Sequence, residues 1–278
     1  MTTKADLAVT GVTGALGGLV ARAVADLRPR VIARDPARAP DLGGGVKTCT
    51  YADAAAAGEA LAGVRTLFMV SATETADRRD QHLTFIEAAA TAGVEHIVYT
   101  SLVGAAADAT FTLARDHHDA EEAIRGSGMA FTFLRNALYA DIAPYLFGED
   151  GVLRGPAGNG KVALVARADI ADVAEVVLRQ PSAHADATYT PTGPEALTLS
   201  EVAQRVGAAL HRDLRFEDES VEDAYAWRRE AYGAEQWQLD AWVSTYTAIA
   251  DGSVATTTDD VQRLTGHPPR SLEDVLGS

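Results

Sequence analysis

The stretch ADLAVTGVTGALGG at residues 5–18 places three glycines at three-residue intervals directly after an apolar run. Residues 7–9 suit a buried strand, and residues 16–27 have the apolar spacing of a helix. A glycine-rich turn between a strand and a helix lets a pyrophosphate approach the free N–H groups at the helix start. Gly11, Gly14 and Gly17 follow G-x-x-G-x-x-G rather than the usual dinucleotide spacing G-x-G-x-x-G, so the interpretation needs support from the rest of the chain.

Strand-like and helix-like segments alternate through the first half of the chain. Such alternation predicts an α/β fold, a doubly wound parallel sheet whose right-handed crossovers place helices on both faces. We expect strands at 7–9, 30–33, 46–51, 66–70, 97–101 and 130–134, and helices at 16–27, 55–62, 80–92 and 116–125. Ligands bind such sheets at the carboxyl ends of the strands, where we expect Arg34, Ser71, Ser101 and Asn136.

The alternation weakens after about residue 140. We therefore expect a dinucleotide-binding domain at 1–150, with its sheet completed by segments within 160–192, and a smaller, mainly helical substrate lobe at 151–278. A helix is expected at 168–178, a short strand at 188–190, and a further helix that Ser200 caps and that runs through Leu210. Residues 225–246 hold all three tryptophans, which would form either the core of the lobe or the wall of an aromatic-substrate pocket.

Composition limits the classes of partner. The 278-residue chain has a formal net charge of −15, whereas binding to a nucleic-acid backbone needs clustered Lys and Arg, so we expect no nucleic-acid partner. No apolar run approaches a membrane span and the N-terminus has no signal-peptide pattern, which predicts a cytoplasmic protein without membrane contact. Cys49 is the single cysteine, so an intrachain disulfide is excluded and a packing role is favoured over a reactive thiol.

Arg34 follows the second expected strand, where the adenosine ribose of a dinucleotide lies in folds of this kind. An acidic residue there would bind the 2′-hydroxyl of NAD, whereas an arginine accommodates the 2′-phosphate of NADP. Arg38 is close enough to complete a basic clamp, and Asp35 is the acidic alternative that would favour NAD. Two arginines in this loop of an acidic protein favour NADP(H) over NAD(H).

Ser101 ends the fifth expected strand, as a serine does in short-chain dehydrogenases. In those enzymes Tyr-x-x-x-Lys follows after about a dozen residues, but here the two positions hold Leu113 and His117. The general acid that would protonate an alkoxide is therefore missing. A quinone needs no such acid, because its hydroquinone anion takes a proton from water, so either the substrate is quinone-like or the site senses a cofactor without turnover.

Histidines and polar residues near the expected strand ends are further candidates. We expect His117 beside the nicotinamide ribose as a hydrogen-bonding or proton-donating group, while its neighbour His118 points elsewhere and a metal site is not expected. Asn136 and Tyr139 follow the sixth strand and are either site residues or a loop turn and a core aromatic. His82 is either a structural group or a ligand.

Several segments together carry a family resemblance. They are VTGVTGALG (9–17), ARDPARA (33–39), QH (81–82), AGVEHIVYTSL (92–102), DHHDAEEAIRGSGMAFTFLRNALY (116–139), GNGKVALVARADIADVA (158–174) and LTGHPP (264–269). The chain resembles the NmrA-like atypical short-chain dehydrogenase/reductase family, and within it the type-2 NAD(P)H:quinone oxidoreductases and triphenylmethane reductase. In place of the acidic residue that the family often has near the adenine, this chain has Thr50 before Tyr51.

The resemblance implies a Rossmann domain with a smaller C-terminal substrate lobe. It implies a catalytic group of Ser101, His117, Asn136 and Tyr139. It also implies that NADP(H) contacts Gly11, Thr13, Gly14, Ala15, Leu16, Gly17, Arg34, Arg38, Tyr51, Ala52, Val70, Ser71, Ala72, Ser101, Leu102, His117 and Asn136.

Three functions remain open from the sequence. The first is an NAD(P)H-dependent reductase that transfers hydride to a quinone or related conjugated aromatic substrate, with a polycyclic aromatic polyketide of antibiotic biosynthesis as one case. The second is a non-catalytic NADP-sensing regulator that binds a protein partner. The third is an isomerase or dehydratase that retains its cofactor. A small aromatic substrate is the expected partner, and homodimerisation is left open.

Overall fold

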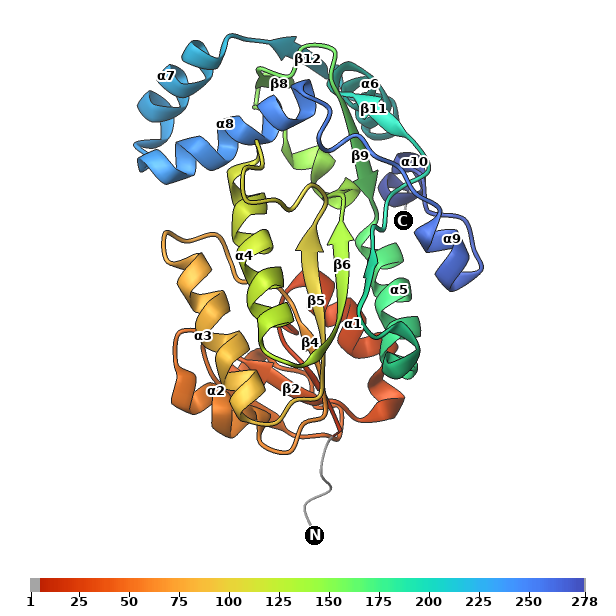
Figure 1. The fold of residues 1–278 in the computed structure, drawn as a ribbon. Coiled ribbons are helices and arrows are strands. Elements are labelled where there is room, and N and C mark those ends of the chain that lie inside the picture. The colour runs from red at the N-terminus through yellow and green to blue at the C-terminus, as the bar shows by residue number, and fades with distance from the viewer. Residues whose placement is uncertain (1–5, 278) are drawn as a thin grey trace. The chain divides into compact units, whose positions relative to one another are not determined.

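The computed structural model describes residues 6–277, and its largest element is a seven-stranded sheet in the order β10-β6-β5-β4-β1-β2-β3 (Figure 1). Neighbouring strands pair in parallel along β3-β2-β1-β4-β5 and between β10 and β6. The strands are β1 (Leu7–Val9), β2 (Arg30–Ala33), β3 (Val46–Thr48), β4 (Thr66–Met69), β5 (His96–Leu102), β6 (Ala130–Asn136) and β10 (Ala187–Tyr189). The strand order reverses between β1 and β4, which is the position where doubly wound sheets bind their ligands.

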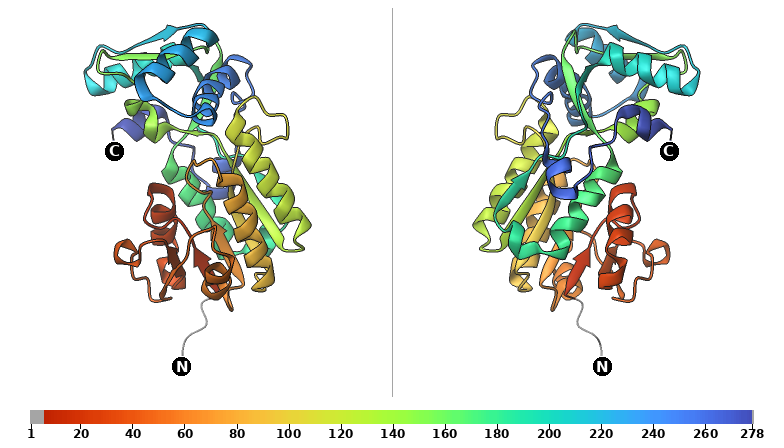
Figure 2. Two further views of the ribbon diagram at one scale, coloured as in Figure 1. Left: turned by 90° about the vertical axis from the view of Figure 1, so that its left-hand side faces the viewer. Right: turned by 90° about the vertical axis from the view of Figure 1, so that its right-hand side faces the viewer.

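Helices cover both faces of this sheet. In Figures 1 and 2, α2, α3 and α4 lie on one face, while α1 and α5 lie on the other. The helices and 3-10 turns are α1 (Ala15–Ala23), η1 (Ala25–Leu27), η2 (Pro36–Arg38), α2 (Ala54–Leu61), α3 (Arg78–Thr91), α4 (Thr112–Gly126), α5 (Arg167–Arg179) and η4 (Pro181–His184). Because both faces are covered, every residue of β1 is buried and the central strands are nearly continuous apolar runs.

The core under α2, α3 and α4 is built from large side chains of strands and helices. Fully buried Leu61 and Phe85 from the helices pack with Tyr99 and Phe133 from the sheet. Cys49 belongs to this cluster, and its burial, with Asp53 nearby, raises the pKa of the thiol to about 11. A thiol held protonated in this way has a packing role, as the sequence suggested.

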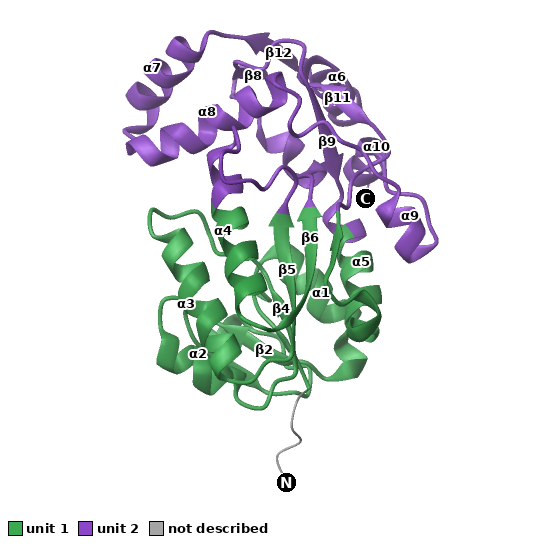
Figure 3. Ribbon diagram, in the orientation of Figure 1, with its two compact units in different colours: residues 1–101, 116–135, 170–189 green, residues 102–115, 136–169, 190–278 purple. Residues whose placement is uncertain are grey.

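The chain divides into two compact units, shown in separate colours in Figure 3. The first comprises residues 1–101, 116–135 and 170–189, and the second residues 102–115, 136–169 and 190–278. The second holds a three-stranded sheet, β11-β9-β7, and a parallel pair, β12-β8, packed with helices. Its elements are β7 (Leu138–Tyr139), η3 (Ala140–Tyr145), β8 (Val152–Gly155), β9 (Lys161–Val165), β11 (Ala196–Thr198), α6 (Leu199–Leu210), β12 (Arg215–Asp218), α7 (Val221–Tyr232), α8 (Gln236–Ala250), α9 (Asp260–Thr265) and α10 (Leu272–Leu276).

The predicted doubly wound α/β fold is confirmed, and the differences are local. Each compact unit is made of three separated stretches, and β10, at 187–189, joins the sheet within the segment 160–192. The helix expected at 116 begins at Thr112, and the sixth strand extends to Asn136. Thr198, not Ser200, caps α6, because Thr198 and Glu201 form a reciprocal capping box. Among residues 6–277, no helix is long and apolar enough to cross a membrane.

Candidate functional site

The turn after β1 keeps the glycines in close backbone contact. Gly11 has a left-handed φ of +64°, and its carbonyl accepts a hydrogen bond from the N–H of Gly14 at 2.9 Å. A Cβ on Gly17 would lie 2.3 Å from the Gly11 carbonyl oxygen, so only glycine fits there. Of the expected contacts, Thr13, Gly14 and Ala15 are exposed, whereas Leu16 is buried in the core and offers its backbone.

The start of α1 leaves its first N–H groups open. Gly14 is the N-cap residue and supplies no side-chain hydrogen bond, and the first turn holds no acidic residue. The initial N–H groups of a helix have no intrahelical partner, and the helix dipole favours an anion beside them. Together with the exposed turn residues, this geometry fits a pyrophosphate.

Val70 follows β4 and packs directly on the glycine turn. Its N–H donates to the Thr10 hydroxyl at 2.9 Å, and its carbonyl accepts from the Tyr51 hydroxyl at 2.6 Å. The Tyr51 ring stacks on Phe85 with centroids 4.1 Å apart, and burial raises the pKa of the Tyr51 phenol above its usual value. Tyr51 therefore ties β4 to the turn, while its neighbour Ala52 is exposed.

The next two residues, Ser71 and Ala72, are also held by side chains. The Ser71 N–H donates to the Thr100 hydroxyl at 2.8 Å. The Ala72 N–H donates to Nε2 of His82 at 2.8 Å, and the Ala72 carbonyl accepts from Nε of Arg78 at 2.9 Å. His82 accepts through Nε2, so its proton is on Nδ1, and burial followed by the charge of Arg78 lowers the pKa of His82 to about 3.

Arg78 also determines the state of His117. One guanidinium nitrogen of Arg78 pairs with Asp116 at 3.1 Å, and another lies 2.9 Å from Nε2 of His117. A guanidinium can only donate, so Nε2 accepts and the Nδ1–H of His117 donates to the Tyr99 hydroxyl at 3.0 Å. Burial, then Arg78 and His82, hold the pKa of His117 well below its usual value. In this arrangement His117 is a neutral, buried group with both nitrogens engaged, which does not suit the proton-donor alternative.

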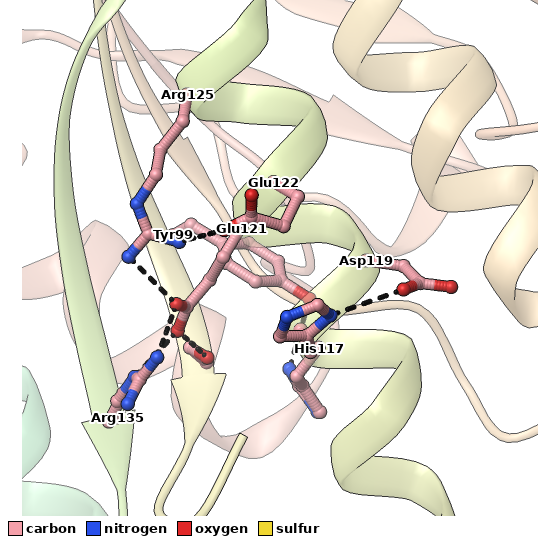
Figure 4. A network of polar contacts seen from close by, with 9 residues as sticks. Tyr99, His117, Asp119, Glu121, Glu122, Arg125 and Arg135 are labelled. Carbon is pink, nitrogen blue, oxygen red and sulfur yellow. Dashed lines mark hydrogen bonds and ion pairs between the residues drawn. The ribbon is translucent and has the colours of Figure 1, made fainter. Parts of the chain in front are cut away.

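Ser101 takes part in a buried charged network. Its hydroxyl donates to Oε1 of Glu121 at 2.6 Å, and the side chain of Glu121 is fully buried. Arg135 pairs with the same carboxylate at 2.6 Å and Arg125 at 3.2 Å. Figure 4 shows both arginine side chains directed at Glu121. The Ser101 hydroxyl is thus occupied, which leaves the backbone of Ser101 for the expected cofactor contact.

Sequence reasoning missed Arg78, Tyr99 and Glu121. His117, Glu121 and Ile124 follow helical spacing on α4 and are all buried, so a hydrophobic-face analysis of this helix could have found Glu121 as a buried acid. Arg78 gives no comparable signal, because it precedes two exposed residues in a polar helix start.

Three candidates, Asn136, Tyr139 and Leu102, belong to the second unit, as does Leu113. Both amide atoms of Asn136 are buried and have no hydrogen-bond partner within residues 6–277. Tyr139 is half-buried under the guanidinium of Arg167, 4.8 Å from its ring centre. Leu102 and Leu113 pack against an apolar cluster, so an aliphatic side chain occupies the position of the missing tyrosine.

Arg34 and Arg38 are exposed on the loop after β2. Between them, the Asp35 carboxylate accepts a hydrogen bond from the Ala37 N–H at 3.0 Å and caps the 3-10 turn η2. The acidic alternative is therefore engaged in its own loop, while both arginines face solvent.

The aromatic stretch at 225–246 lies on α7 and α8, and its members are only partly buried. Trp227 donates to Glu219 at 2.7 Å, and Tyr232, 63% exposed, contacts both Trp227 and Trp242. Tyr246 packs so tightly on Gly155 that a Cβ there would lie 2.1 Å from its ring. These aromatics flank the core of the second unit and do not form it.

Comparison with known proteins gives a consistent result. The sequence model of a family described as NAD(P)H-binding matches residues 11–181. A (4-alkanoyl-5-oxo-2,5-dihydrofuran-3-yl)methyl phosphate reductase of Streptomyces griseus is 35% identical, over 96% of this chain and 95% of the relative. An NADPH-dependent quinone oxidoreductase of Escherichia coli, solved with NADPH, is 31% identical with a TM-score of 0.87 over 98% of both chains. The Citrobacter triphenylmethane reductase solved with NADP(H) is 30% identical, with a TM-score of 0.84 over 98% of this chain and 99% of that one.

Proposed function

Because the chain belongs to the NAD(P)H-binding family and is an NAD(P)H-dependent oxidoreductase, we propose that it transfers hydride from NADPH to a quinone or a related conjugated acceptor. The observation that carries the proposal is the glycine turn packed on Val70 at the reversal of strand order, with no catalytic tyrosine on α4. The cofactor supplies the hydride when it is bound, and the protein supplies orientation.

The chain has residues that fit three parts of NADPH: the pyrophosphate, the 2′-phosphate and the nicotinamide end. The exposed turn at Thr13 and Gly14, with the open N–H groups of α1, would hold the pyrophosphate. Arg34 and Arg38 would hold the 2′-phosphate, since Asp35 is engaged in capping η2. Asn136 is the proposed contact of the nicotinamide end, since its buried side-chain amide has no hydrogen-bond partner within residues 6–277 and a ligand could supply one.

The absence of a general acid indicates which class of hydride acceptor suits this site. Leu113 stands where a tyrosine would donate a proton, and His117 is neutral with both nitrogens engaged. An acceptor whose reduced form is a stabilised anion suits such a site, because water can protonate it. The names of the relatives describe quinone, triphenylmethane and oxodihydrofuran substrates. A quinone-bearing polycyclic aromatic compound is the finer proposal, with Tyr139 as a contact.

One assay separates this reductase from a cofactor-sensing protein. Purified protein is mixed with NADPH and a panel of benzoquinones, naphthoquinones, hydroxyanthraquinones and conjugated oxodihydrofurans, and the NADPH absorbance is followed. We expect protein-dependent oxidation with at least one quinone, and none with heat-inactivated protein. Tight NADPH binding with no oxidation of NADPH by any acceptor would refute the reductase proposal and favour a cofactor-sensing protein.

A further inference from the structure

The two peptide groups on either side of Ala72 are fixed by side chains rather than by strand pairing: His82 holds the Ser71–Ala72 peptide and Arg78 holds the Ala72–Thr73 peptide. Nε2 of His82 accepts from the Ala72 N–H at 2.8 Å, and Nε of Arg78 donates to the Ala72 carbonyl at 2.9 Å. Both side chains come from the first turns of α3, and both are at least 96% buried, with exposures of 0% for His82 and 4% for Arg78. Buried polar groups of this kind are strongly orienting, because breaking either contact leaves an unpaired group away from water.

The contact of His82 sets the direction of the Ser71 carbonyl. The structure contains no cis peptide bond in its described residues, so the Ser71 C=O and the Ala72 N–H point in opposite directions. With the Ala72 N–H directed at α3, the Ser71 carbonyl is directed away from α3. Within residues 6–277 this carbonyl has no backbone or side-chain hydrogen-bond donor, and Ser71 is half-buried.

The residue before Ser71 packs on the glycine turn. The preceding residue, Val70, packs on Gly11 so closely that a Cβ added to Gly11 would lie 2.8 Å from the Cβ of Val70. Val70 and Ser71 are themselves anchored to Thr10 and Thr100 through their N–H groups. An unpaired acceptor is therefore held rigidly one residue from the proposed pyrophosphate turn.

We infer that His82 and Arg78 are positioning residues for the cofactor: His82 orients the Ser71 carbonyl to accept a hydrogen bond from a hydroxyl or amide of the bound dinucleotide, and Arg78 fixes the next peptide by holding the Ala72 carbonyl. The inference rests on the proposed function, since it requires NADPH to bind at the reversal of strand order. Neither side chain touches the reacting atoms. They hold the segment Val70–Ala72, which follows β4, in one orientation before the cofactor binds. The segment therefore loses little conformational entropy on binding.

His82→Leu tests the inference, because leucine fills much of the space but cannot accept the Ala72 N–H. We expect the Kd for NADPH to rise about tenfold, as loss of one oriented hydrogen bond implies. His82→Gln, whose amide oxygen can reach the Ala72 N–H, should keep the Kd within about twofold of the wild type. The matched control is His96→Leu, since His96 is another buried histidine, bonded to Thr132, but it begins β5 and so lies at the amino ends of the strands, opposite the carboxyl ends that bear the glycine turn.

A measurement without cofactor keeps the test independent of activity. Hydrogen–deuterium exchange of the Ala72 amide should be slow in the wild type and in His82→Gln, and fast in His82→Leu. If His82→Leu does not fold, His82→Asn takes its place, because its amide is too short to reach Ala72. An unchanged NADPH Kd in a folded variant with a fast Ala72 amide would overturn the inference. Failure of the wild type itself to bind NADPH would instead overturn the proposed function.

Discussion

Gly11 and Val70 pack against each other at the carboxyl ends of β1 and β4, the two neighbouring strands between which the sheet order reverses. The contact is so close that a Cβ on Gly11 would lie 2.8 Å from the Cβ of Val70. Packing alone therefore requires a glycine at position 11. The same residue has a φ of +64°, which side chains disfavour, so two independent constraints exclude a larger residue.

Gly17→Ala should disturb the packing of the glycine turn without changing any polar side chain. A Cβ there would lie 2.3 Å from the Gly11 carbonyl oxygen, and this backbone cannot move without displacing Val70. We expect a loss of about 1–3 kcal/mol in unfolding free energy, together with weaker NADPH binding. Chemical denaturation and NADPH titration measure the two effects.

Gly58→Ala is the matched control for this substitution. Gly58 lies inside α2, and a Cβ there would meet nothing within 4 Å. Alanine should therefore raise the unfolding free energy by about 0.4–1 kcal/mol, since it restricts the unfolded chain. Equal effects of the two substitutions would show that the turn tolerates a side chain.

Arg34→Ala should separate the two nicotinamide cofactors. The exposed Arg34 is proposed to bind a 2′-phosphate that NADH lacks, and charge-assisted hydrogen bonds to phosphate are strong. We expect NADPH affinity to fall by about tenfold or more and NADH affinity to stay within about twofold. Arg65→Ala is the control, because Arg65 is an exposed arginine paired with Glu95 just before β4. Equal losses for both cofactors in Arg34→Ala would refute the clamp.

His82 should make the protein less stable in acid. Burial and then Arg78 lower the pKa of His82 from 6.5 to about 3, so below pH 6.5 the unfolded chain binds a proton that the folded one does not. Its stabilising contribution is complete above pH 6.5 and is lost as the pH falls toward 3. The unfolding free energy should fall by about 1.4 kcal/mol per pH unit from this group within that window.

His82→Gln provides the comparison, because glutamine does not titrate. Denaturation curves between pH 7 and pH 4 should give a shallower slope for the variant, by about 1.4 kcal/mol per pH unit in the acid part of the range. Carboxylates that titrate in both proteins cancel in the difference. Parallel curves for the two proteins would mean that His82 is protonated in the native state.

The sequence predicted the fold and the glycine turn well, because both depend on local periodicity. The strands and helices recur at regular intervals, and Gly11 and Gly17 meet a backbone requirement that adjacent residues reveal. The family resemblance is also confirmed. In contrast, the partners of His117 and Ser101 come from Arg78 and Glu121, at 39 and 20 residues along the chain. Helical spacing can show that His117 and Glu121 face inward, but it does not show which side chains of other elements meet them there.

Glu121→Gln should destabilise the protein, because it removes a fully buried charge. The fully buried carboxylate accepts hydrogen bonds from Ser101, Arg125 and Arg135, and a neutral amide would leave the charge of Arg135 uncompensated. Removing one partner of a buried pair costs about 3–5 kcal/mol, but both arginines are partly exposed, so we expect about 2 kcal/mol. Glu122→Gln is the control on the same helix, since Glu122 pairs with Arg125 at the exposed surface and should cost at most about 0.5 kcal/mol. Urea denaturation of both variants makes the comparison, and similar losses would mean that the buried carboxylate of Glu121 contributes no more to stability than the exposed one of Glu122.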